Sequence, residues 1–131
     1  MAKTFRQMVD EAKAEVPAIS PEDAQRCVEQ DPNTLIVDVR EPSGIAETGG
    51  IPGAKNVPLG ELPLKADREL SEDLRDTDLQ DRSRPIMTTC GAGGQAALAA
   101  KTLKDMGFQN VSFIEGGFKG WIAAGLPTER P

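Results

Sequence analysis

The stretch that decides the fold is residues 86–106, IMTTCGAGGQAALAAKTLKDM, in which an apolar run, a cysteine, a glycine-rich turn and an alanine-rich segment follow one another. Ile86–Thr89 predicts a buried strand, because β-branched side chains suit a pleated surface that is covered on both faces. Residues 95–106 are good helix formers, and Gly107 suits the end of a helix. The segment therefore predicts a strand that leads through Cys90 and a glycine turn into a helix.

The same alternation extends outward on both sides. Further strands are predicted over residues 35–39, 54–58 and 111–114. Helices are predicted over residues 4–16, 20–30, 71–75 and 118–122, with a polar surface excursion over residues 59–84. Ser20 followed by Pro21 indicates a helix start, since serine caps helices and proline fits the first helical position. Short strands alternating with helices predict an α/β fold with a mainly parallel sheet.

Composition bounds the class of protein. The chain has 131 residues, which suits one domain, and carries 15 basic and 21 acidic side chains for a net charge of −6. This charge would repel a polyanion, so no nucleic-acid partner is expected. No apolar run approaches the roughly 20 residues that a bilayer requires, and the N-terminal residues lack the apolar core of a signal peptide. We therefore expect a cytoplasmic protein with no membrane partner.

The chain has no histidine and no tyrosine. This excludes the Ser-His-Asp triad, the cysteine–histidine dyad and most zinc sites. Covalent chemistry would then use Cys, Ser, Thr, Lys or a carboxylate, without an imidazole base.

Cys90 is the strongest candidate for such chemistry, because it follows a predicted strand at the edge where open α/β sheets bind ligands. The small residues 91–94 allow backbone N–H groups to form an anion-binding nest, and the following helix adds the positive end of its dipole. Both features favour a thiolate and predict that Cys90 is the reactive thiol. The alternative is a buried structural thiol beside a tight turn. Cys27, inside a predicted helix, is expected to be a core or boundary residue.

Four motifs resemble, in order and spacing, the rhodanese homology domain. They are LIVDVREP at residues 35–42, GIPGA at 50–54, the Cys90 loop and EGGFKGW at 115–121. The resemblance covers residues 18–127, so we expect an N-terminal helical extension over residues 1–17 and a rhodanese-like domain over residues 18–131. It implies a central, mainly parallel five-stranded sheet flanked by helices on both faces, and a single-domain sulfurtransferase.

The resemblance also implies the roles of individual residues. Cys90 would be the nucleophile that takes a sulfane sulfur from thiosulfate or from a persulfide or polysulfide donor. It would pass this sulfur, as a persulfide, to a thiophilic acceptor such as a thiol or cyanide. Substrate-binding N–H groups would come from Gly91, Ala92, Gly93, Gly94 and Gln95. No metal and no organic cofactor is implied.

The sequence departs from the family pattern at two positions. Gln95 stands where the family often has arginine, and an amide cannot clamp a dianion such as thiosulfate as arginine would. This puts efficient use of thiosulfate in doubt. Gly50 stands where many members have histidine, a difference that we interpret as structural.

Asp38 and Arg40 share one face of a strand. We interpret them as structural support, an ion pair that holds the next loop, rather than as an acid–base pair.

Two other functions compete with sulfur transfer. A rhodanese module without activity could serve in protein interaction or regulation; the presence of Cys90 in a donor-rich loop argues against this function, and Gln95 in place of arginine keeps it open. The second competing function is that of a cysteine-dependent phosphatase or arsenate reductase. Such loops are typically one residue longer and end in an arginine that binds the oxyanion, which this loop lacks.

Overall fold

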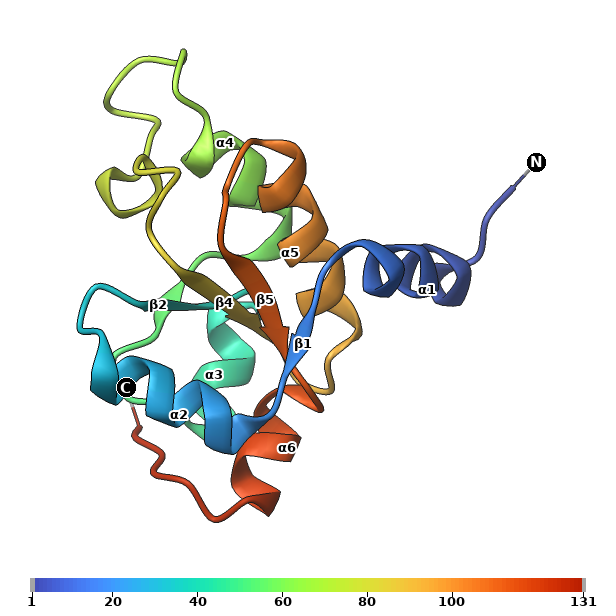
Figure 1. Cartoon of the computed structure of the whole chain (residues 1–131), viewed down its shortest axis with the longest axis vertical. Coiled ribbons are helices and arrows are strands. Elements are labelled where there is room, and N and C mark those ends of the chain that lie inside the picture. The colour runs from blue at the N-terminus through green and yellow to red at the C-terminus, as the bar shows by residue number, and fades with distance from the viewer. Residues whose placement is uncertain (1, 131) are drawn as a thin grey trace.

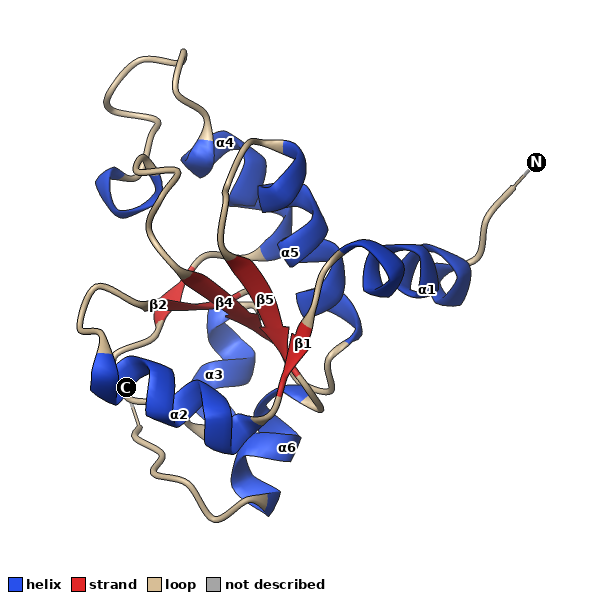
Figure 2. Cartoon of the chain, in the orientation of Figure 1, coloured by secondary structure: helices blue, strands red, loops and turns tan. Residues whose placement is uncertain are grey.

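A five-stranded, all-parallel sheet lies between two layers of helices in the computed structural model, which describes residues 2–130 (Figures 1 and 2). The strands are β1 (Ala18–Ile19), β2 (Leu35–Asp38), β3 (Lys55–Asn56), β4 (Ile86–Thr89) and β5 (Val111–Ile114), in the spatial order β1-β5-β4-β2-β3. The helices are α1 (Phe5–Glu15), α2 (Pro21–Gln30), α3 (Pro42–Thr48), α4 (Leu62–Ala66), α5 (Gly94–Asp105) and α6 (Gly117–Ala123). The predicted α/β class and parallel sheet are confirmed.

The core has two halves, one on each face of the sheet. Val37 and Ile86 face the half that contains α1, α4 and α5. Their neighbours Ile36 and Met87 face the other half, which contains α2 and α6. Side chains alternate in this way because successive residues of a strand point to opposite faces. Figure 1 shows α2 and α6 on one side of the sheet and α5 on the other.

The helix α1 packs against α5. Thr4 caps it through a reciprocal pair of hydrogen bonds with Gln7, and its inward face buries Val9 and Ala12 in the α5 half of the core. The Lys104 ammonium also donates to the Glu15 carbonyl at 2.9 Å. The first helix therefore shares its core with the sheet, while the proposed division at residue 17 stays a prediction.

Several elements differ from the sequence expectation. Residues 71–75 form a turn in which the Leu74 N–H donates to the Ser71 carbonyl, and not the predicted helix, because a segment this short and exposed has no buried face to hold a helix. The helix in this region is α4. The turn-rich stretch after β2 contains α3, which begins at Pro42. The two-residue strand β1 was also not predicted.

All five strands are parallel, so their carboxyl ends lie at one edge of the sheet. Asp38 ends β2 beside Thr89 of β4, and Cys90 follows at once. This register brings the two candidate groups to neighbouring positions. Within residues 2–130, no helix has the length and apolar character needed to cross a membrane.

Candidate active site

Cys90 is the centre of the candidate site, and the residue is 2% exposed. Its Sγ accepts hydrogen bonds from the backbone N–H groups of Gly93, at 3.0 Å, and Ala96, at 3.3 Å. Gly93 has φ = +110°, a conformation that residues with a side chain rarely adopt, so glycine is needed for this loop to fold around the sulfur. The predicted nest around Cys90 therefore has two N–H donors on the sulfur itself.

The sulfur also takes the place of a capping side chain for α5. The N-cap residue of this helix is Gly93, which has no side chain to accept from the first turn. The Ala96 N–H is the third of the helix, the position that a serine or aspartate cap would satisfy. Cys90 Sγ occupies that acceptor position. Nothing in residues 2–130 accepts from the N–H groups of Gly91, Ala92, Gly94 or Gln95.

A second glycine motif holds the loop from the other side. The N–H of Phe118 donates to the Cys90 carbonyl at 2.7 Å, and that of Lys119 donates to the Gly91 carbonyl at 3.1 Å. Gly117 makes this approach possible, because a Cβ added there would lie 2.5 Å from the Cys90 oxygen. Sequence reasoning treated this motif as a turn before a packing helix. Its two consecutive glycines were the signal of a close backbone approach.

Asp38, which is buried, and Arg40, which is half-buried, form an ion pair. The Arg40 Nε donates to both carboxylate oxygens of Asp38, and its Nη2 donates to Oδ2 at 2.7 Å. The same guanidinium donates to Thr48 Oγ1 and the Gly49 carbonyl, and its carbon lies 4.6 Å from the centre of the Phe118 ring. The pair thus joins the end of β2 to the end of α3 and to α6.

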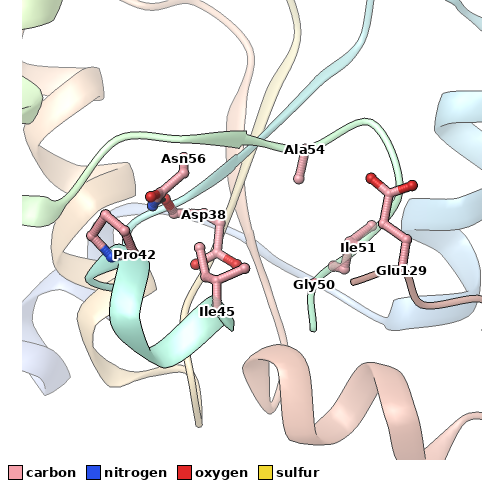
Figure 3. A pocket seen from close by; sticks show the side chains of 8 residues that line it. All are labelled: Asp38, Pro42, Ile45, Gly50, Ile51, Ala54, Asn56 and Glu129. Carbon is pink, nitrogen blue, oxygen red and sulfur yellow. Dashed lines mark hydrogen bonds between the residues drawn. The ribbon is translucent and has the colours of Figure 1, made fainter. Parts of the chain in front are cut away.

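A hollow of about 250 Å³ lies beside this ion pair and is lined mainly by apolar side chains. Figure 3 shows the Asp38 side chain between Ile45 and Asn56, with Glu129 at the opposite end. Gly50 lines the hollow, and a Cβ there would lie 3.4 Å from Ile45, an ordinary van der Waals contact. No residue of the Cys90 loop lines it. The polar groups at this end already have partners within the protein, since Asn56 Nδ2 donates to the Asp38 and Arg40 carbonyls.

Gln95 and Cys27, the remaining residues singled out from the sequence, differ in their distance from the Cys90 loop. Gln95 is exposed in the first turn of α5, and the loop from Cys90 to Gln95 contains no cation. Cys27 is half-buried against the α2–α6 half of the core, on the face of the sheet opposite Cys90. Among residues 2–130, no group of three or more His, Cys, Asp or Glu side chains is arranged to hold a metal ion.

Comparison with known proteins gives the family. The chain matches the Rhodanese-like domain over residues 20–124. It is 30% identical over 118 residues to the thiosulfate:glutathione sulfurtransferase of Saccharomyces cerevisiae, a match that covers 84% of this chain and 81% of that protein. Relatives of this kind support a transferase role in general.

Solved structures agree with this fold. A polysulfide-sulfur transferase homodimer from Wolinella succinogenes is 29% identical, with a TM-score of 0.75 over 97% of this chain and 88% of that chain. A protein of unknown function from Rhodopseudomonas palustris, described as a possible tyrosine phosphatase, is 32% identical, with a TM-score of 0.89 over 98% of this chain and 96% of that chain. With the sheet, the cysteine loop and the sulfurtransferase relatives together, the chain belongs to the rhodanese-like family.

Proposed function

We propose that this protein is a sulfurtransferase in which Cys90 carries the transferred sulfur as a persulfide. The observation that supports this most is the position of Cys90 Sγ at the start of α5, where two backbone N–H groups donate to it. Such donors stabilise a thiolate, which is the nucleophilic form of cysteine. They also suit the negative charge of a persulfide.

The proposed reaction has two displacement steps. The Cys90 thiolate attacks the outer sulfur of the donor and forms a new S–S bond. The donor's own bond to that sulfur breaks, and its electron pair leaves with sulfite, with a thiolate or, for a polysulfide, with the chain shortened by one sulfur. A thiol or cyanide acceptor then attacks the outer sulfur, and the Cys90 thiolate is released. Neither step needs an imidazole base, a metal or an organic cofactor.

The loop supplies donors rather than charge. The N–H groups of Gly91, Ala92, Gly94 and Gln95, which have no acceptor in the described chain, are the groups proposed to hold the donor and the terminal sulfur. Arg40 is engaged by Asp38 and is assigned a structural role. Without a loop cation, a singly charged persulfide fits the site better than the thiosulfate dianion.

An inactive interaction module is the second candidate. The observation in its favour is the burial of Cys90, which is 2% exposed and leaves a donor little direct access to the sulfur. A phosphatase activity is disfavoured because residues 90–95 lack an arginine for an oxyanion. An aryl phosphate assay separates that possibility from sulfur transfer.

The mass of the intact protein tests the proposal. Treatment with polysulfide should add the mass of one sulfur atom, and Cys90→Ser should abolish this gain. Cys27→Ser is the matched control and should retain it, because Cys27 lies on the opposite face of the sheet. Alkylation of the two thiols should also be faster at Cys90. An unchanged mass in a folded protein, or sulfur found on Cys27, would favour the inactive module.

A further inference from the structure

Thr88 carries a buried hydroxyl that the proposed reaction does not use. It lies on β4 two residues before Cys90, and its side chain is fully buried. Residues i and i+2 of a strand share a face, so Thr88 and Cys90 both face α5. The Thr88 Oγ1 donates to the Ala96 carbonyl at 2.7 Å, whereas its other acceptor, the Ser112 carbonyl, is 3.4 Å away. The short bond to Ala96 is therefore the one that matters.

Ala96 connects this hydroxyl to the reactive sulfur. Its N–H donates to Cys90 Sγ and its carbonyl accepts from Thr88, so one residue of α5 is bonded twice to β4 and its end. A helix carbonyl in the first turn already has a backbone partner one turn later. The bond from Thr88 is thus additional to the hydrogen bonds within the helix, and it fixes the distance between Ala96 and β4.

The start of α5 needs such an anchor, because its N-cap, Gly93, and its first residue, Gly94, are both glycines, and glycine loses the most backbone freedom on folding. The helix has no side-chain cap of its own. Side chains of α1 support it from the other side, since a Cβ on Gly94 would lie 3.2 Å from the Phe5 ring and 3.6 Å from Val9. Thr88 is the support that comes from the sheet.

We infer that Thr88 is a positioning residue that holds the Ala96 N–H against Cys90 Sγ and so sets the reactivity of this thiol. The effect of Thr88 on sulfur transfer rests on the function proposed above. The effect of Thr88 on thiol reactivity does not, because alkylation reports on the Cys90 thiolate whether or not the protein transfers sulfur.

The test uses the full chain with Cys27→Ser, so that Cys90 is the only thiol. Thr88→Val keeps the shape of the side chain and removes the hydroxyl. We expect alkylation by neutral iodoacetamide to be about 2- to 10-fold slower near pH 7, the effect of weakening one hydrogen bond. Near pH 10, where a cysteine is ionised without assistance, the rates should agree. Equal rates near pH 7, or equal slowing at both pH values, would overturn the inference.

Thr88→Ser and Thr88→Ala form a second pair, which decides the matter if the valine variant does not fold. Both lose the same methyl group, and only serine keeps the donor. Serine should retain the parent's rate near pH 7 and alanine should not; similar rates in the two would refute the role of the hydroxyl. Ile86→Val is the control for stability alone, because Ile86 lies on the same face of β4 and has no donor. It should leave the alkylation rate unchanged.

The two proposals can fail separately. If the parent protein gains no sulfur from polysulfide but the serine and alanine variants still differ in alkylation, the proposed function fails and the role of Thr88 stands. If the parent gains sulfur and the two variants alkylate alike, the function stands and the positioning role fails.

Discussion

At the scale of single residues, the bonds around Cys90 come mainly from the backbone. Its sulfur accepts from the N–H groups of Gly93 and Ala96, and its carbonyl accepts from that of Phe118. Backbone dipoles held by a fold cost no further reorganisation when charge develops on the sulfur. Glycine at 117 is required for this arrangement, because any Cβ there would overlap the Cys90 carbonyl. The site is thus specified by small residues as much as by the cysteine.

Gln95→Arg tests the missing charge in the loop. We expect kcat/KM for thiosulfate to rise, by at most about 10-fold, because a guanidinium can pair with the dianion but position 95 is exposed and screened. The gain should shrink at high salt, and the rate with a neutral or protein-borne donor should change less. Gln95→Met is the control of similar length without charge. A thiosulfate rate in the arginine variant no higher than in the methionine variant would contradict the idea.

At the scale of elements, α1 and α5 form one layer over the sheet. Val9 and Ala12 of α1 lie in the same buried cluster as Ala99 and Leu103 of α5. Close helix packing of this kind is possible because α5 is rich in alanine along the contact. The first helix therefore contributes to the support of the Cys90 loop through Gly94.

Substitutions in α1 measure how far this helix stabilises the fold. Val9 is 7% exposed, so Val9→Ala should lower the free energy of unfolding by about 1–3 kcal/mol through lost burial and a residual cavity. Met8 is the matched control, one residue away and 46% exposed. Met8→Ala should change the free energy of unfolding by less than about 0.5 kcal/mol. Urea unfolding followed by circular dichroism gives both values. Equal effects would mean that α1 does not pack against α5 as described.

At the scale of the whole molecule, part of the net charge of −6 lies in the long surface segment between β3 and β4. The pKa of the Asp67 carboxyl is lowered by the N–H groups of Glu69 and Leu70, and that of Asp81 by the Ser83 hydroxyl and N–H. A hydrogen bond from the Lys55 ammonium lowers the pKa of Asp78. These carboxylates favour the folded state only while they are ionised.

The acid side of the stability profile follows from these shifts. A carboxyl whose folded pKa lies below its unfolded value contributes fully above the unfolded value, near 3.8, and loses that contribution as pH falls through the folded value. We expect the urea midpoint to be level near pH 6 and to fall below about pH 4. Asp67→Asn should flatten the decline slightly, because one such group is removed. A midpoint that stays level down to pH 3 would be the opposite result.

Local patterns in the sequence determined much of this protein. The apolar runs of β2, β4 and β5, the Ser20–Pro21 start of α2, and the cysteine followed by glycines are each local, so the α/β class and the candidate nucleophile could be inferred without coordinates. The helix predicted over residues 71–75 was wrong and shows the limit of such patterns, since a short exposed segment forms only a turn when no tertiary packing supports it.

Only the tertiary structure decided the features that depend on partners distant in the chain. β1 is a strand because two residues pair with β5, and no two-residue segment signals a strand by itself. The approach of Gly117 to the Cys90 carbonyl and the bond from Thr88 to Ala96 likewise join segments separated in sequence. Their physical reason is packing between elements, since a hydrogen bond between separated residues exists only after the sheet has brought both groups together.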